Sequence, residues 1–425
     1  MKRFVMILPP SPWLLNDRDQ VFNGALYVVS YCQRHPDWEI DVCDLSSLEE
    51  KNWYIPVGDM YGITGVTPHF PIIKKIIDKL KEREPHKPVY VGGVHATVLP
   101  EHLLQNTKVD GCVRGAGERP MWDLLCGEPP SRIAGICTRE TWSEPVQLDV
   151  IDTPFPAREK VDYYEYLKPR TYKYLGNLRD ANIMTSRGCP YKCCYCASNT
   201  LCGGKIQFRS PKNVAAELKH LKEEYDIGMC CFSDDTFILN KERVKEICRL
   251  IKDLGVRWYC LTRVDHVDEE LFKIMVDAGC MSIAFGLESG SNKVLKAINK
   301  NTTVEQAYEA LYITKKAGLR VRGQLMVGLP FEENEDIEAT KEMIINIRED
   351  VDTLGLHIFQ PYPGTDAWDN PEKYGLDIDK TTDFNDWHTI GSSTNLRASE
   401  EILKRYKYLL SAIAYKNIEH YGAKE

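Results

Sequence analysis

The sequence lacks any long apolar stretch. No window of about 18 consecutive apolar residues, the length that a membrane-spanning helix requires, occurs in the 425 residues. The apolar run nearest the N-terminus, residues 4–8, ends at Pro9 and Pro10 and is too short for the core of a signal peptide. We therefore expect a cytoplasmic protein with no membrane partner.

A surplus of positive charge is also absent. The chain has 54 Lys and Arg against 62 Asp and Glu, and its net charge of -8 argues against nucleic acid as a partner. Hydrophobic residues at 43% and charged residues at 27% exclude a disordered or collagenous chain. At roughly 100–200 residues per domain, the length predicts two or three domains.

Cysteine is the residue type present in unusual number, at fifteen. The chain is too long to be a small secreted scaffold, and in a reducing cytosol cysteines serve as core residues, metal ligands or redox groups. Ten of them lie mostly in predicted strands or helices and are interpreted as small apolar core residues: Cys32, Cys43, Cys112, Cys126, Cys137, Cys230, Cys231, Cys248, Cys260 and Cys280. The other five lie between residues 189 and 202.

The first part of the chain alternates short apolar strands with helical stretches. Strands are expected at residues 4–8, 38–42, 61–66, 89–91 and 109–113. Helices are expected at residues 25–33 and 72–77. This alternation predicts an α/β fold with a doubly wound, Rossmann-like parallel sheet. Such sheets bind ligands at the carboxyl ends of their strands, where three Gly-rich loops occur here.

A second α/β series follows a Pro-punctuated connection at residues 152–158. Its six expected strands are residues 181–185, 229–232, 258–261, 282–285, 322–327 and 354–359. Its five expected helices are residues 214–225, 241–254, 269–278, 304–317 and 337–347. Six units are too few for a closed eightfold barrel and predict a partial (β/α)6 barrel.

The predicted organisation has four parts. A Rossmann-like domain at residues 1–140 is followed by a linker at 141–180, the partial barrel at 181–370 and a short helical extension at 371–425. In the extension, apolar residues through Ile418 recur on one helical face, with Ser399 as the expected N-cap. We interpret this helix as one that packs on the domain.

The strongest chemical signal is Ser186-Arg-Gly-Cys189-Pro-Tyr-Lys-Cys193-Cys194-Tyr195-Cys196. Thiolates spaced like Cys189, Cys193 and Cys196 on one tight loop can converge on one metal centre, and iron–sulfur clusters are held by thiolates, usually four. Three ligands would leave one iron open to a small molecule. Alternatively, Cys202 is a fourth ligand of a closed site, Cys194 shifts the ligand register, or the cysteines are core residues.

This motif after a barrel strand resembles the signature of the radical S-adenosylmethionine (SAM) superfamily. The resemblance implies a 4Fe-4S cluster on Cys189, Cys193 and Cys196, whose open iron chelates SAM and whose reduction cleaves SAM to a 5′-deoxyadenosyl radical. Further segments at strand ends match positions that contact SAM in this superfamily: Tyr195, Ser233, Asp234, Asp235, Arg263, Glu288, Gln324 and Val327. The segment 233–235 departs from the usual Gly-Gly-Glu. Without the resemblance, these residues would be helix-capping turns, a surface arginine and core strand residues.

Residues 360–365 resemble the end of the barrel in the cobalamin-linked branch of the superfamily. His357 and Tyr362 are expected to face the substrate there, although a lone histidine is more often structural. The Gly-rich loops at residues 62–68, 91–97 and 113–118, and the connection at 154–158, also resemble that branch.

The resemblance implies that the first domain binds cobalamin (B12). The residues expected to contact it are Thr64, Thr67, Gly92, Gly93, His95, Ala96, Thr97, Arg114, Gly115, Gly117 and Glu118. No Asp-x-His-x-x-Gly stretch occurs, so we expect base-off binding without a protein histidine on cobalt, and His95 is interpreted as a loop contact. Alternatively, the domain has lost cobalamin.

The resemblance favours a cobalamin-dependent radical SAM methyltransferase. It would transfer a methyl group from SAM, through methylcobalamin, to an unactivated carbon or a phosphinate of a small-molecule intermediate, with flavodoxin or ferredoxin as electron donor and under anaerobic conditions. One alternative is a radical SAM cyclase, ring-contraction or redox rearrangement enzyme, with cobalamin in a non-methylating role or absent. Another is a non-catalytic metal-knuckle binding module. The sequence predicts no oligomeric state.

Overall fold

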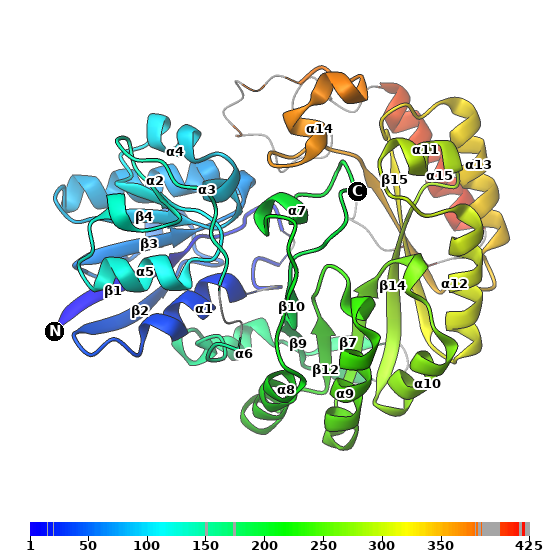
Figure 1. Cartoon of the computed structure of the whole chain (residues 1–425), viewed down its shortest axis with the longest axis horizontal. Coiled ribbons are helices and arrows are strands. Elements are labelled where there is room, and N and C mark those ends of the chain that lie inside the picture. Colours follow the sequence, from blue (N-terminus) through cyan, green and yellow to red (C-terminus); the bar gives the residue numbers. More distant parts are fainter. Residues whose placement is uncertain are drawn as a thin grey trace. The chain divides into compact units, whose positions relative to one another are not determined.

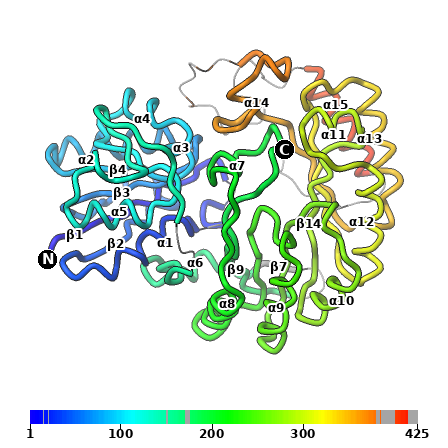
Figure 2. The backbone as a smooth tube through the Cα atoms, in the orientation of Figure 1, coloured from blue at the N-terminus to red at the C-terminus, as the bar shows by residue number. Residues whose placement is uncertain are grey.

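The computed structural model describes residues 1–14, 16–19, 21–148, 152–172, 176–378, 380, 384, 400–415 and 419–420. The chain forms two compact units. Figures 1 and 2 show the chain coloured by residue number, from blue at the N-terminus to red at the C-terminus. The first unit comprises Met1–Tyr166, Thr200–Gly203 and Lys380–Thr389. The second unit comprises Leu167–Asn199, Gly204–Asp379 and Ile390–Glu425.

The first unit contains a six-stranded sheet in the order β2-β1-β3-β4-β5-β6. Its strands are β1 (Lys2–Leu8), β2 (Trp38–Asp44), β3 (Met60–Thr64), β4 (Val89–Gly92), β5 (Gly111–Val113) and β6 (Ile136–Cys137). The first five are parallel, which confirms the predicted doubly wound sheet, and β6 joins β5 antiparallel. The strand order reverses between β1 and β3, the place where such sheets bind ligands.

The helices of the first unit follow the strands. They are α1 (Asn23–Cys32), α2 (Phe70–Arg83), α3 (Val94–Val98), α4 (Pro100–Asn106), α5 (Glu118–Leu125) and α6 (Tyr163–Tyr166). Alternate residues of β1 point to opposite faces. Phe4, Met6 and Leu8 pack with Val29 of α1 and Leu124 of α5 in one core, and Val5 and Ile7 are fully buried as well. This burial on both faces is typical of a parallel sheet covered by helices.

The second unit contains a seven-stranded, parallel sheet in the order β17-β16-β15-β14-β13-β12-β9. Its strands are β9 (Asp180–Ile183), β12 (Met229–Phe232), β13 (Arg257–Thr262), β14 (Cys280–Glu288), β15 (Arg320–Val327), β16 (Thr353–Ile358) and β17 (Glu419–His420). The six predicted strands are confirmed. The two-residue β17, paired with β16, was not predicted because two residues carry no periodicity.

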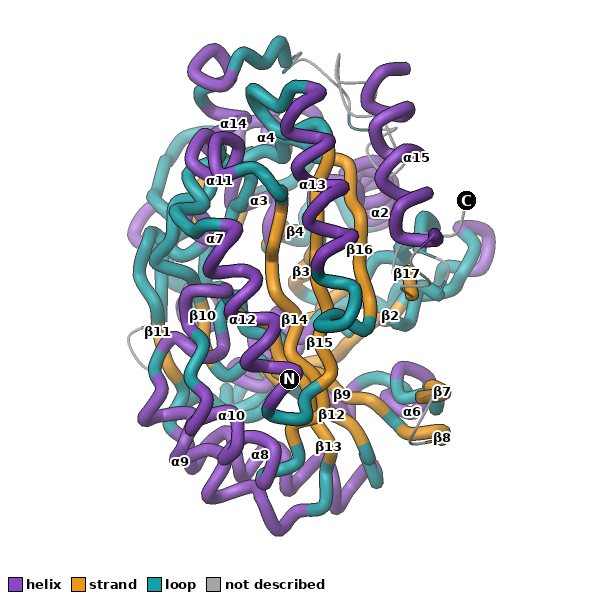
Figure 3. The backbone as a smooth tube through the Cα atoms, turned by 90° about the vertical axis from the view of Figure 1, so that its right-hand side faces the viewer, coloured by secondary structure: helices purple, strands orange, loops and turns teal. Residues whose placement is uncertain are grey.

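Five long helices cover one face of this sheet (Figures 1 and 3). They are α8 (Pro211–Tyr225), α9 (Lys241–Ile251), α10 (Glu269–Asp277), α12 (Val304–Lys316) and α13 (Asn334–Asn346). Shorter elements are α7 (Ser198–Leu201), α11 (Asn292–Ala297), α14 (Asp366–Asp369) and two small antiparallel pairs: β7 (Arg170–Tyr172) with β8 (Gly176–Leu178), and β10 (Ser186–Arg187) with β11 (Gln207–Phe208).

The two faces of this sheet differ in exposure. On β15, Val321, Leu325 and Val327 are fully buried, whereas Gln324 and Met326 point to the other face and are only half-buried. Strand register places Met326 beside His357 of β16, which is exposed. We call this more accessible side the open face of the barrel sheet.

The helix α15 (Glu400–Tyr415) corresponds to the predicted amphipathic helix of the tail. Leu409 and Ile413 are fully buried, and Tyr408 donates a hydrogen bond to Glu338 of α13 at 2.6 Å. The expected N-cap Ser399 and the last apolar residue Ile418 lie outside the described residues. Within the described part of the chain, no helix is both long and apolar enough to cross a bilayer.

Candidate active site

The cysteine loop begins where β10 ends, at the carboxyl end of the first barrel strand. Gly188 has a φ of 93°, a backbone conformation that suits glycine, and turns the chain into Cys189. Two hydrogen bonds fasten the loop to the turn after α11: Cys194 N donates to Ile298 O at 2.9 Å, and Asn299 Nδ2 donates to Lys192 O at 2.7 Å. The loop is therefore attached to the segment of the barrel that follows β14 and α11.

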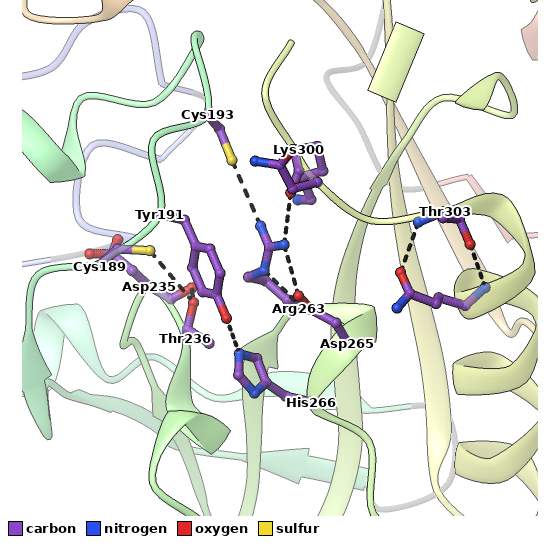
Figure 4. A network of polar contacts seen from close by, with 12 residues as sticks. Cys189, Tyr191, Cys193, Asp235, Thr236, Arg263, Asp265, His266, Lys300 and Thr303 are labelled. Carbon is purple, nitrogen blue, oxygen red and sulfur yellow. Dashed lines mark hydrogen bonds and ion pairs between the residues drawn. The ribbon is translucent and has the colours of Figure 1, made fainter. Parts of the chain in front are cut away.

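The three motif thiols lie on this loop and contact different partners. Cys189 Sγ lies 3.9 Å from Thr236 Oγ1, and Cys193 Sγ accepts a hydrogen bond from Arg263 Nη1 at 3.8 Å (Figure 4). Cys196 Sγ donates to Ser198 Oγ at 3.4 Å. Among the residues that the structure describes, no three His, Cys, Asp or Glu side chains are gathered as a metal site.

The donor set nevertheless fits an iron–sulfur cluster. Cys196 interacts electrostatically with both Cys189 and Cys193, so the thiols form one local group of soft ligands. Burial raises the pKa of the Cys193 thiol, while the charges of Lys300 and Arg263 act in the opposite direction. The loop thus combines three thiols with two nearby cations, whose charges partly offset the rise in the pKa of the Cys193 thiol that burial causes.

The neighbouring cysteines lie in other environments. Cys194 is fully buried in an apolar cluster with Val294, Leu295, Ile298 and Phe359. This packing supports Cys193 as the predicted ligand rather than Cys194. Cys202 belongs to the segment Thr200–Gly203 of the first unit, whereas the three motif cysteines belong to the second unit.

Tyr195 and Glu288 meet in a buried polar contact beside the cysteine loop. Tyr195 Oη donates to Glu288 Oε1 at 2.9 Å, and Lys300 Nζ donates to the same oxygen at 2.7 Å. Lys300 Nζ also lies 3.2 Å from Tyr195 Oη. Burial together with the Glu288 charge raises the pKa of Tyr195. Two residues predicted to contact SAM therefore share a third partner that the sequence did not indicate.

Arg263 is buried and makes several interactions at once (Figure 4). Its Nε and Nη2 donate to the two carboxylate oxygens of Asp265 at 2.9 Å each, and Nη2 also donates to Lys300 O at 2.8 Å. The guanidinium lies 3.6 Å from the centroid of the Tyr191 ring, a cation–π distance. It is not a surface arginine, because it links the loops after β10, β13 and α11.

The acidic segment 233–235 divides into three roles. Ser233 is exposed. Asp234 is buried and accepts hydrogen bonds from Thr185 N at 2.6 Å, Thr185 Oγ1 at 2.5 Å and Ser186 Oγ at 2.6 Å, so it holds the chain that leads into the cysteine loop. Asp235 accepts from Ser198 Oγ at 2.9 Å, and burial raises the pKa of its carboxyl group. Of the two carboxylates, Asp235 is the more accessible.

The remaining predicted residues of the barrel lie on different faces. Gln324 Oε1 lies 2.8 Å from His357 Nε2, and both side chains are on the open face. Val327 is fully buried on the opposite face, under the helices. Tyr362 is 43% exposed, and its carbonyl accepts hydrogen bonds from Thr365.

The three Gly-rich loops of the first unit are joined by hydrogen bonds. Thr97 Oγ1 donates to Gly93 O at 2.8 Å and accepts from Gly115 N at 3.0 Å. A Cβ atom on Gly93 would lie 2.7 Å from Gly65 O, and one on Gly115 would lie 2.2 Å from Val146 O. Both glycines are therefore required by the packing of loop against loop.

The accessible edge of these loops is small and uncharged. Thr64, Gly92 and Gly117 are half-buried, and Val66 and Gly93 are exposed. A short, uncharged edge of this kind suits a wide macrocycle rimmed by amides, so these residues fit cobalamin. Other predicted contacts are buried in this structure: Thr67, His95, Ala96, Thr97, Arg114 and Glu118.

His95 is fully buried under the loops. Its ring lies between 5.3 and 5.5 Å from the rings of Phe70, His102 and Phe384, and Nδ1 lies 3.3 Å from Thr67 Oγ1. Among the described residues, Nε2 has no hydrogen-bond partner. Burial lowers the pKa of His95 to about 3, so the ring is neutral. Arg114 is also engaged internally, donating to Thr97 O at 3.0 Å and Ser143 O at 2.7 Å.

Lys300, Thr236, Asp265 and His266 were missed by the sequence reasoning. His266 Nε2 lies 2.5 Å from Tyr191 Oη, beside Arg263 (Figure 4). Asp265 and His266 lie two and three residues after Arg263, so their position at a strand end was an available signal. The sequence contained no such signal for Lys300, because a lysine in a polar turn is normally exposed.

Comparisons with known proteins agree with this architecture. Residues 183–344 match the radical SAM superfamily, and residues 23–125 match the B12 binding domain. The chain is 31% identical to an uncharacterized methyltransferase, PH0819, of Pyrococcus horikoshii, over 86% of this chain and 82% of that protein.

Solved structures show the same fold. The radical SAM methyltransferase TsrM of Kitasatospora setae, with tryptophan and a SAM analogue bound, superimposes with a TM-score of 0.70 at 18% identity, over 84% of this chain and 73% of that chain. The cobalamin-dependent radical enzyme OxsB gives a TM-score of 0.69 at 15% identity, over 99% of this chain and 62% of that chain.

The cysteine loop on a partial barrel defines a radical SAM enzyme, and the preceding sheet defines its B12-binding branch. The chain belongs to the cobalamin-dependent radical SAM family, whose cofactors are a 4Fe-4S cluster, SAM and cobalamin. The predicted family, fold class and cofactors are thereby confirmed, and the non-catalytic metal-knuckle alternative loses its support.

Proposed function

We propose that this enzyme is a methyltransferase that uses SAM and cobalamin to methylate an unactivated carbon, or a phosphinate, of a small-molecule intermediate. The observation that carries the proposal is the combination, in one chain, of the three-thiol loop and the B12-binding domain with the 31% identity to a protein named as a methyltransferase. When bound, the cluster with SAM supplies a carbon-centred radical and cobalamin supplies a methyl group.

The chain's own residues bind and orient these groups. Cys189, Cys193 and Cys196 would hold the cluster. Tyr195 and Glu288, fixed to each other, would form one wall of the SAM site. Arg263 would keep the Cys193 side of the loop in place through its contact with Sγ at 3.8 Å.

The substrate would bind over the open face of the barrel sheet. Gln324 and His357 are paired there at 2.8 Å, and the half-buried Met326 lies beside His357. A surface with one amide, one imidazole and an apolar side chain suits a small molecule with a few polar groups. Electrons would come from flavodoxin or ferredoxin.

Cobalamin would bind base-off, without a histidine on cobalt. The support for this proposal is the position of His95, the histidine of the Gly-Gly-x-His loop, whose ring is fully buried against Phe70, His102 and Phe384.

The deciding experiment is anaerobic purification followed by quantification of iron, cobalamin and reaction products. With methyl-labelled SAM and candidate substrates, formation of both 5′-deoxyadenosine and S-adenosylhomocysteine, with label in the product, supports methyl transfer. Formation of 5′-deoxyadenosine alone contradicts it.

That second outcome would favour a radical cyclase or rearrangement. One comparison supports this candidate: the chain is 30% identical to the anaerobic magnesium-protoporphyrin IX monomethyl ester cyclase of Rubrivivax gelatinosus, over 73% of this chain. The alignment spans only 58% of the cyclase, so the likeness covers little more than half of that enzyme.

A further inference from the structure

Lys300 is fastened to the cysteine loop by its own backbone and by its neighbours. It lies between Asn299 and Asn301, whose φ angles of 57° and 55° are left-handed, so the turn after α11 has an unusual, tightly defined shape. Arg263 Nη2 donates to Lys300 O at 2.8 Å, and Asn299 Nδ2 donates to Lys192 O at 2.7 Å. These contacts link the turn at Lys300 directly to Lys192 and, through Arg263, to Cys193.

The ammonium group of Lys300 is part of a buried ion pair. The side chains of Lys300 and Glu288 are 6% and 9% exposed, and Nζ lies 2.7 Å from Oε1. Glu288 has a φ of 63°, a strained conformation for a residue other than glycine. Gly286 makes room for the pair, because a Cβ there would lie 2.3 Å from Glu288 Oε1 and 2.8 Å from Lys300 Nζ. An exposed ion pair would require neither the strained backbone of Glu288 nor a glycine at position 286.

Two ion pairs lie near Cys193, and Figure 4 shows the one between Arg263 and Asp265. Arg263 presents Nη1 to the sulfur while its other nitrogens are neutralised by Asp265. Lys300 interacts electrostatically with Cys193, and its counter-charge is Glu288. Charges interact more strongly in a buried environment than in water, so the buried Lys300–Glu288 pair contributes to the potential at the cysteine loop.

We propose that Lys300 is a positioning residue that sets the reduction potential of the cluster, with Glu288 acting in the opposite sense. Reduction adds one negative charge to the cluster. The buried ammonium stabilises that charge and the carboxylate destabilises it. The same pair holds the hydroxyl group of Tyr195. This inference rests on the proposed function only in requiring the cluster on the cysteine loop.

The test is a charge cycle measured by anaerobic spectroelectrochemical titration of the full-length, cluster-loaded enzyme without SAM. Lys300→Met is expected to lower the ratio of reduced to oxidised cluster at a fixed potential about tenfold, which corresponds to ~59 mV for one electron. Glu288→Gln is expected to raise the ratio, and the double variant to return it near the wild-type value. Lys296→Met, an exposed lysine at the end of α11, is the matched control and leaves the ratio unchanged.

Lys300→Arg keeps the charge and is expected to keep the wild-type potential. If Lys300→Met does not fold, the double variant replaces it, since no unpaired charge is then buried, and its difference from Glu288→Gln reports Lys300 alone. Unchanged potentials in cluster-loaded variants, or shifts of the same sign for Lys300→Met and Glu288→Gln, overturn this inference. A wild-type protein that binds no cluster overturns the proposed function itself.

Discussion

At the scale of single residues, the cysteine loop places adjacent side chains in different environments. Cys193 accepts a hydrogen bond from Arg263, whereas Cys194 packs among Val294, Leu295 and Ile298. The motif spacing in the sequence left both assignments open. The packing of Cys194 supports Cys193, because a thiol turned into an apolar core cannot also reach a metal on the other side of the loop.

Replacing these cysteines one at a time separates the two environments. Cys193→Ala is expected to lose most of its iron, whereas Cys194→Ala keeps its iron and loses about 1 kcal/mol of stability from the core. Cys202→Ala is expected to keep its iron as well. The measurements are iron and sulfide per chain after anaerobic reconstitution, with thermal unfolding. Loss of the cluster in Cys194→Ala would show that the register is wrong, and loss in Cys202→Ala that the site is closed.

Asp234 gives a second prediction at this scale. The carboxylate accepts three hydrogen bonds from Thr185 and Ser186, and the amide of an asparagine side chain could not accept all three. We expect Asp234→Asn to lower the free energy of unfolding by about 1–3 kcal/mol and to weaken cluster retention. Ser233→Ala, at the exposed neighbour, is the control and is expected to change stability by less than about 0.5 kcal/mol. Equal stabilities in urea unfolding would contradict this structural role of Asp234.

At the scale of elements, the long segments were predictable and the short ones were not. The six barrel strands and five long helices follow from their hydrophobic periods. The two-residue β6 and β17 and the six-residue α11 were missed, because so few residues give no period. The omission of α11 also concealed Lys300, whose burial depends on where this short helix directs the chain.

The β15–α13 connection carries a buried acid, Glu332, close to α15. Glu332 accepts a hydrogen bond from Gly328 N at 2.6 Å, and its carbonyl accepts one from Arg405 of α15 at 3.1 Å. Burial raises the pKa of Glu332 from 4.5 to about 7, with Arg405 acting in the opposite direction. The fold therefore favours the protonated acid. Its contribution to stability is complete below pH 4.5 and is lost as the pH rises through about 7.

Glu332→Gln removes this titration while keeping an oxygen acceptor for Gly328. We expect the variant to gain stability relative to the wild type between about pH 5 and pH 8, by up to about 3 kcal/mol at the upper end. The measurement is the difference in melting temperature across the pH series. Glu335→Gln, at an exposed position in the first turn of α13, is the control. A difference that does not grow with pH contradicts the prediction.

At the scale of the whole molecule, each unit brings its own cofactor chemistry. The first unit offers an uncharged loop edge with its histidine buried beneath, and the second offers thiols, buried ion pairs and an open sheet face. The comparisons place this combination in one enzyme family. The coordination of cobalt by the B12-binding domain is a property of the intact enzyme. A histidine ligand to cobalt would be detectable in the spectrum of that enzyme.

The His95→Ala variant tests the absence of such a ligand. We expect the cob(II)alamin form of the wild type to be base-off, with no nitrogen hyperfine splitting from a lower ligand in its electron paramagnetic resonance spectrum. The spectrum of His95→Ala should be the same, although the variant loses stability because the ring fills the space beside Phe70 and Phe384. A nitrogen splitting that disappears in His95→Ala would make His95 the cobalt ligand and contradict the prediction.

The sequence by itself determined the class of protein. Local patterns can be recognised from the sequence alone. Here they are the spacing of Cys189, Cys193 and Cys196, the order of strands and helices, and the Gly-rich loops. Only the tertiary structure decided which side chains meet. Glu288 and Lys300 are brought together by a strained backbone conformation, a glycine and a turn that has no hydrophobic periodicity. His95 turns inward because the rings of Phe70, His102 and Phe384 enclose it. Burial and charge pairing are properties of packing, and packing arises between segments far apart in the chain.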